Sequence, residues 1–269
     1  MKQNRTAVPS GNVMGTMPLN RLLLSMSIPM MISMMVQALY NIVDSIFVAR
    51  IGENALTAVS LAFPVQILMI SAGVGTGVGI NAFLSRSLGE RNFDQVNKAA
   101  VNGLFLVWTS SLLFVIAGFF FAEPFFRSQT DIEEIVRYGK DYLFVVCVFS
   151  AAVFSQVTFE RLLASTGKTF YAMISQGAGA LINIILDPIM IFGLFGFPRM
   201  EVRGAAIATV IGQAAAALIA LYFNLTKNHE VKLSFRGFRP DGAVIKSIYR
   251  VGVPSILMQS IGSIMTYGF

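Results

Sequence analysis

Six long apolar stretches constrain the fold of this chain more than any other feature of its sequence. A helix needs about 20 mostly apolar residues to cross a hydrocarbon core of roughly 30 Å. Stretches of this kind lie at residues 22–48, 58–83, 101–121, 142–159, 171–195 and 204–225, and a seventh begins near residue 251. Hydrophobic residues make up 55% of the chain and charged residues 13%, with a mean hydropathy of +0.69, outside the usual range of soluble domains. We therefore predict an all-α, polytopic membrane protein.

The two ends of the chain and its cysteine content fit this class. Residues 1–18 contain Lys2 and Arg5 but no apolar core, so we expect no cleaved signal peptide. Cys147 is the only cysteine, so we expect no disulfide within the chain and no thiolate metal cluster. The seventh stretch is still apolar at Phe269, and we therefore expect the natural protein to continue beyond it.

The distribution of positive charge predicts the orientation. Of the 20 Lys and Arg residues, 14 fall in the N-terminal segment and in the connections after the second, fourth and sixth spans. Positively charged connections stay on the cytoplasmic side, so we predict a cytoplasmic N-terminus. Because these residues are scattered over four segments without interleaved aromatic residues, we expect no nucleic-acid partner.

A charged connection at residues 226–250 divides the chain into a six-helix lobe, residues 1–225, and the start of a second lobe, residues 251–269. Arg21 and the SIP sequence at 27–29 are echoed by Lys246 and the GVP sequence at 252–254, with an offset of 225 residues in both cases. A duplicated unit would predict a full protein of about 450 residues, with two parallel repeats. Chance similarity between apolar segments is the alternative interpretation.

The first span carries a polar stripe that ends in an aspartate. Helical spacing predicts that its five polar residues share one face, namely Ser33, Gln37, Tyr40, Asn41 and Asp44. A carboxylate near the bilayer interior costs at least ~2.5–3.5 kcal/mol, which makes Asp44 a candidate functional residue. The alternative is that the stripe only joins helices through hydrogen bonds.

A second aspartate, Asp187, lies in the fifth span within the sequence NIILDPIMIFG. Asn183 precedes it by one turn, so the amide is expected beside the carboxylate. Pro188 removes a backbone donor, which predicts a kink and a carbonyl oxygen free to bind a cation or water. The predicted depths of Asp44 and Asp187, ~9 and ~12 Å from the outer span ends, predict convergence on one cavity. Alternatively, Asp187 only caps a broken helix.

Three segments resemble the multidrug and toxic compound extrusion (MATE) family: NIILDPIMIFG, IPMMISMMVQALYNIVDSIFVARIG in the first span, and FERLLASTGK after the fourth. The chain is most similar to the bacterial branch that includes staphylococcal exporters and the DinF proteins. The resemblance implies the N-terminal half of a twelve-helix transporter that exchanges cationic or amphipathic compounds for protons or sodium ions. It also implies a cation-coupling role for Asp44, Asn183 and Asp187, a bend at Pro29, and a drug counter-charge at Glu160.

We place Tyr40 and Asn41 with this cation-coupling set, with sodium at Asp44, Asn183 and Asp187 as one possible occupant. Gln37 and Glu160 are expected in the substrate cavity, and Pro29 and Pro188 at helix bends. Glu160 could equally form an ordinary interfacial pair with Arg161. We expect no catalytic residue and no cofactor other than the coupling ion.

Glycines in the second span form the sequence GVGTGVG at 73–79. The spacing does not match a dinucleotide-binding loop, and the segment lies within a span rather than after a strand. It indicates close helix packing through the pairs Gly73/Gly77 and Gly75/Gly79, and the run 214–217 of four alanines indicates the same.

The predicted function is cation-coupled export of small organic, cationic compounds across the cell membrane. Burial favours the uncharged form of a carboxyl group, so proton or sodium binding at Asp44 and Asp187 would depend on the state of the cavity. The main alternative is a flippase or an exporter of a lipid-linked or metabolic substrate. A membrane-embedded hydrolase would need a histidine or metal constellation at depth, and the only histidine, His229, is outside the spans. A structural or channel subunit would not require the Asp-Pro sequence.

Overall fold

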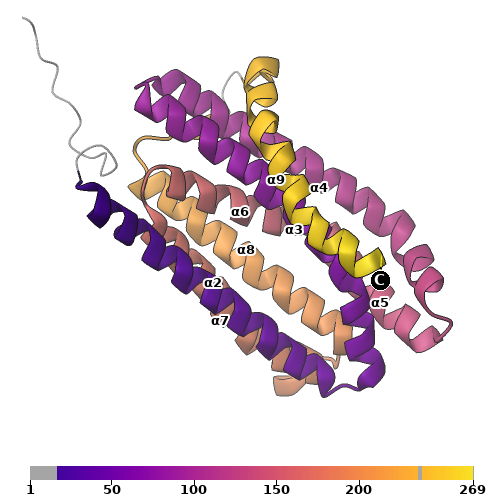
Figure 1. Cartoon of the computed structure of the whole chain (residues 1–269). Helices are drawn as coiled ribbons and strands as arrows, with labels where there is room; N and C mark the ends of the chain where they lie inside the picture. The colour runs from indigo at the N-terminus through magenta and orange to yellow at the C-terminus, as the bar shows by residue number, and fades with distance from the viewer. Residues whose placement is uncertain (1–16, 236–237, 269) are drawn as a thin grey trace, which may run out of the picture.

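The computed structural model describes residues 17–235 and 238–268, with side chains described up to Ile261. Lys2, Arg5 and Phe269, named in the sequence analysis, lie outside these residues, as does Arg236, one of the 14 basic residues counted there. Every regular element in the described residues is helical, and Figure 1 shows the helices packed side by side as an elongated bundle. The elements are α2 (Leu19–Ala49), α3 (Glu53–Gly89), α4 (Phe93–Gln129), α5 (Glu133–Val148), α6 (Ser150–Ser165), α7 (Thr169–Phe192), η1 (Leu194–Gly196), α8 (Glu201–Lys227) and α9 (Gly242–Gly268).

The six predicted spans correspond to described helices. α2, α3, α4, α7 and α8 are each long and apolar enough to cross a membrane, and α5 with α6 forms a sixth, bent span. The connection predicted at residues 226–250 is shorter than expected, because α8 extends to Lys227 and α9 already begins at Gly242. The all-helical, multi-pass prediction is confirmed.

The fourth span, predicted as one helix over residues 142–159, is instead broken. α5 and α6 meet at Phe149 with a bend of 48°, and Phe149 has φ −97° and ψ 18°. Ser150, the first residue of α6, makes a hydroxyl–hydroxyl hydrogen bond of 3.0 Å with Ser111 of α4. No proline or glycine marks this position, which is why the sequence pattern did not reveal the break.

Pro188 does not interrupt α7, so the interpretation that Asp187 caps a broken helix is wrong. The helix continues through Pro188 to Phe192 and ends at Gly193, which adopts the left-handed conformation with φ 74° and ψ 41°. The predicted span end at Phe195 falls in η1. Pro29 similarly lies inside the continuous helix α2.

The glycines of α3 face two different helices. A Cβ atom at Gly73 would lie 3.0 Å from the Phe154 ring, and one at Gly77 would lie 3.0 Å from Arg161 Cγ, both on α6. A Cβ at Gly75 would lie 2.7 Å from the backbone nitrogen of Ile256 on α9. Close packing at both glycine pairs is therefore confirmed, and it joins α9 to the first lobe.

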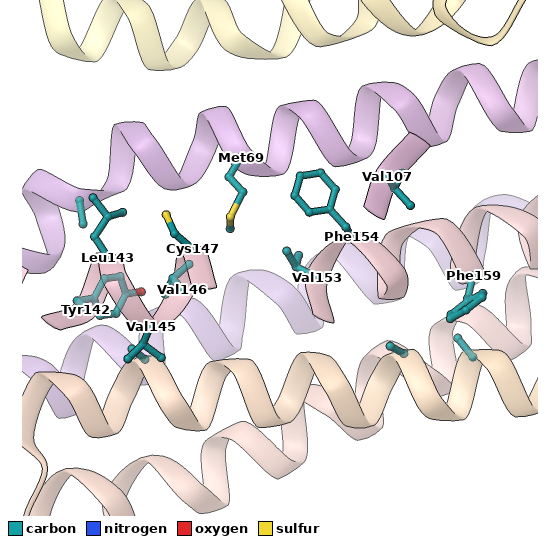
Figure 2. Close-up of a cluster of buried hydrophobic side chains, with 14 of the residues drawn as sticks. Met69, Val107, Tyr142, Leu143, Val145, Val146, Cys147, Val153, Phe154 and Phe159 are labelled. Atoms are coloured by element: carbon teal, nitrogen blue, oxygen red, sulfur yellow. The ribbon is translucent and has the colours of Figure 1, made fainter. Parts of the chain in front are cut away.

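A hydrophobic core lies between α3, α4, α5 and α6. Figure 2 shows Met69 of α3 and Val107 of α4 beside Cys147 of α5 and Phe154 of α6. These side chains are at most 2% exposed, so Cys147 is a packing residue here. By contrast, α2 buries only Pro29 and Val48, and most of its large apolar side chains face outward, as expected for contact with lipid.

Candidate functional site

A cavity of about 200 Å³ lies between α2, α3, α6, α7 and α8. Half of the residues in its wall are polar, and the others include Met30, Met34 and Val74. The polar lining residues are Ser33, Gln37, Tyr40, Gln156, Glu160, Arg161, Thr169, Gln176, Asn183, Thr209 and Gln213. α6, which the 48° bend sets at an angle to α5, supplies Gln156, Glu160 and Arg161 to this wall.

Contacts between α2 and α7 fix the relative level of their polar residues. Thr169 Oγ1 donates a 3.4 Å hydrogen bond to the carbonyl oxygen of Ser25, and Gln176 Nε2 donates one of 3.1 Å to Gln37 Oε1. Further along both helices, the Phe47 and Phe192 rings lie 6.3 Å apart. These three pairs of contacting residues are separated by 144, 139 and 145 positions in the sequence, and Asp44 and Asp187 by 143. Because the separation is nearly constant, the two helices run parallel and the two aspartates lie at the same level.

Asp187 lies fully buried in α7, with Asn183 and Thr209 beside it. Asn183 Nδ2 donates to Asp187 Oδ1 at 3.2 Å and to Thr209 Oγ1 at 3.4 Å. All three residues are at most 7% exposed. The predicted pairing of Asn183 with Asp187 is therefore present, and α8 contributes Thr209 to the same group.

Three buried oxygen atoms of this region have no hydrogen-bond partner within the described residues: Asp44 Oδ1, Asp187 Oδ2 and Asn183 Oδ1. An unpaired buried acceptor costs about 1–3 kcal/mol, and more when it carries charge. Asp44 and Asp187 lie at the same level on the parallel, adjacent helices α2 and α7. A group of oxygen acceptors lacking donors fits a bound proton or a hard cation such as sodium.

The structure separates Asn41 from the other residues of the predicted stripe. Asn41 is exposed and lines a shallow depression with Leu56 and Phe63 of α3, away from the main cavity. It follows Tyr40 by one residue, a rotation of about 100°, which turns it off the inward face. The prediction of a single five-residue face is wrong for Asn41, whereas Ser33, Gln37 and Tyr40 line the cavity and Asp44 is half-buried.

Glu160 lines the cavity and accepts a 3.0 Å hydrogen bond from Gln156. Its neighbour Arg161 also lines the cavity, so the wall carries both signs of charge. No ion pair joins Glu160 to Arg161 within the described part of the chain, in contrast to the ordinary interfacial pair considered above.

The sequence analysis missed six polar residues of the cavity wall: Gln156, Arg161, Thr169, Gln176, Thr209 and Gln213. Thr209 lies in the small-residue sequence GAAIATVIGQ, where a threonine resembles a packing residue. The available signal was its one-turn spacing from Gln213, which also lines the cavity. Gln176 lies seven residues, about two turns, before Asn183, so the available signal was a helical spacing that puts both on one face of α7. Its hydrogen bond with Gln37 shows that this face meets α2.

Comparisons with known proteins agree with this architecture. The MatE family model matches residues 29–189, and the chain belongs to this family. It is 30% identical over 244 residues to the FAD transporter of Shewanella oneidensis, covering 91% of this chain and 54% of that protein. It is 27% identical over 233 residues to the multidrug export protein MepA of Staphylococcus haemolyticus, covering 86% of this chain and 51% of MepA.

Solved structures show the same fold. A MOP superfamily transporter from Pyrococcus furiosus matches with a TM-score of 0.88 and 31% identity, covering 97% of this chain and 57% of that protein. An outward-facing multidrug resistance MATE family transporter matches with a TM-score of 0.85 and 32% identity, covering 92% of this chain and 54% of that one. The chain spans about half the length of the relatives it matches, and its fold is that of one lobe of a MATE-type membrane transporter.

Proposed function

We propose that this chain forms the N-terminal lobe of a cation-coupled antiporter that exports cationic or amphipathic organic compounds across the cell membrane, with its N-terminus in the cytoplasm. The observation that carries the proposal is the buried group of Asp187, Asn183, Thr209 and Asp44 with its unpaired oxygens, next to a polar cavity. Similarity to MepA, a multidrug export protein, supports the substrate class.

Cation binding and substrate binding would exclude each other. A proton or sodium ion supplies the positive charge that the unpaired carboxylate oxygens of Asp44 and Asp187 lack, which lowers the cost of burying them. A cationic substrate near Glu160 supplies the same sign of charge from the cavity. One conformation of the transporter therefore favours the bound cation and the other favours the bound substrate. Rocking between the two conformations couples cation entry to substrate export.

α2 is the helix best suited to respond to the occupant. Its inner half is held to α7 by two hydrogen bonds, those of Ser25 with Thr169 and of Gln37 with Gln176. Neutralising Asp44 would remove the charge that draws cations towards α2 and allow the helix to repack around Pro29. This repacking would shrink the cavity and expel the substrate.

A second function, export of an anionic metabolite, is favoured by one observation. Arg161 lines the cavity, and an arginine suits carboxylate or phosphate groups. One relative is named a FAD transporter. A single cavity arginine beside Glu160 supports this function less well than cationic export, because no further basic residue lines the cavity within the described residues.

Dye efflux under separate ion gradients tests the proposal. Full-length protein in vesicles is given a cationic dye, with either a pH gradient or a sodium gradient imposed. We expect one of the two gradients to drive dye export, and collapse of that gradient with an ionophore to stop it. Export that persists without either gradient would contradict cation coupling, and transport of anionic dyes alone would favour the second function.

A further inference from the structure

The described part of the connection between α8 and α9, residues 228–235 and 238–241, is here called the strap and is fixed to α4 on both sides of residues 236 and 237. The backbone amide of Lys232 donates a 2.7 Å hydrogen bond to Asn97 Oδ1, and that of Asp241 donates one of 3.0 Å to Asn102 Oδ1. Val231 is 4% exposed. Each asparagine thus binds the backbone of the strap, which lies against the helix rather than projecting away from it.

The middle of the strap forms an aromatic patch with α4, made of Phe105, Trp108, Phe235 and Phe238. The Phe235 and Trp108 rings stack with centroids 5.8 Å apart and an interplanar angle of 11°, and the Phe238 and Phe105 centroids are 5.7 Å apart. Phe235 and Trp108 are each still 45% exposed. Phe105 and Trp108 belong to the first two turns of the apolar stretch of α4, so the patch faces the boundary between lipid chains and headgroups.

The indole N–H of Trp108 already has a hydrogen-bond acceptor within the protein. Trp108 Nε1 donates a 3.0 Å hydrogen bond to Ser155 Oγ of α6, so the part of the ring not covered by Phe235 is available for apolar contact. It is also the only tryptophan among the 269 residues.

Positive charge lies next to the patch. Lys232 and Arg239 are exposed, and neither has an ion-pair partner within the described residues. Lys98 of α4 contacts Asp241 of the strap at 3.8 Å, which neutralises that acid locally. Two unpaired cations beside exposed rings on a membrane-spanning helix match a ligand with an anionic head and apolar chains.

We propose that the strap and α4 bind an anionic phospholipid, with its acyl chains on the aromatic patch and its phosphate between Lys232 and Arg239. A lipid is favoured over an acidic peptide because the rings lie within the apolar stretch of a membrane-spanning helix. The lipid would bind on the segment that joins the first lobe to α9. This proposal does not depend on the transported substrate or on the coupling ion.

Contact quenching of Trp108 fluorescence tests the proposal. Full-length protein is reconstituted in phosphatidylcholine nanodiscs with a minority of phosphatidylglycerol, and the acyl chains of one lipid or the other carry bromine. Subtracting the emission of a Trp108→Phe variant isolates the signal of Trp108. We expect phosphatidylglycerol to quench at a mole fraction about thirtyfold lower than phosphatidylcholine, since each of the two basic residues near an anionic headgroup contributes about fivefold.

The double variant Lys232→Gln/Arg239→Gln should lose this preference while phosphatidylcholine still quenches. The matched control Lys227→Gln/Arg250→Gln removes two exposed charges from the same end of the molecule and should retain it. Equal quenching by the two lipids in the unmodified protein would overturn the proposal, as would absence of quenching by both. Loss of the preference on adding soluble glycerol phosphate would assign the site to free phosphate and also overturn it.

Discussion

Asp187→Asn is expected to abolish coupled export while the protein still inserts into the membrane. The amide keeps the shape of the side chain, and the carbonyl oxygen can still accept the 3.2 Å hydrogen bond from Asn183. It cannot bind a proton at physiological pH and offers a cation no net charge, so the exchange reaction loses its driving ion. We expect export to fall about a hundredfold, near the upper end of the factors of about 5–150 that coupling free energies of about 1–3 kcal/mol produce. Dye efflux from energised vesicles measures the loss.

Asn41→Ala provides the matched control for Asp187→Asn. Asn41 was predicted in the same site but lies exposed outside the cavity, so this variant should retain export. Membrane insertion and thermal unfolding of both variants should match those of the unmodified protein. Undiminished export by Asp187→Asn would show that this carboxylate has no coupling role.

Gly179→Ala is expected to separate α7 from α8 beside the candidate site. An alanine Cβ at this position would lie 2.6 Å from the carbonyl oxygen of Gly212 and 2.7 Å from Ala216 Cβ. Overpacking of this kind costs typically 1–3 kcal/mol. Because Asn183 and Thr209 hold the same two helices together one turn away, we expect both a lower unfolding temperature and weaker export.

Gly177→Ala is the control on the same helix. No atom lies within 4 Å of the Cβ that this substitution would add, so no overlap results. Alanine is favoured over glycine in a helix by about 1 kcal/mol, and the variant should be at least as stable as the parent. The same loss of stability in Gly177→Ala and Gly179→Ala would show that the contact with Gly212 is not the cause.

The sequence was sufficient to predict the helices and the polar residues with regular spacing. Asp44, Tyr40, Gln37 and Asn183 were identified because a polar group inside an apolar stretch has few explanations. Asn183 could be paired with Asp187 because one helical turn fixes their distance. Close packing at Gly73/Gly77 followed from small residues repeating at the same interval.

Features that depend on contacts between helices could not be predicted in this way. The bend at Phe149 depends on packing that brings Ser150 against Ser111, far away in the sequence. Thr209 joins the site only because α8 crosses α7 at a pair of glycines. Asn41 was placed wrongly because a polar stripe on a helix has a finite width, and its edges are decided by the neighbouring helices.

Competition between cation and substrate at equilibrium tests the central claim most directly. The affinity of full-length protein in detergent for a fluorescent cationic substrate is measured across a range of pH at fixed sodium, and across a range of sodium at fixed pH. The account predicts that one of these two cations weakens substrate binding, and that Asp187→Asn removes the dependence. Substrate affinity that stays constant across both ranges would contradict the claim that the buried aspartates exchange a cation for the exported compound.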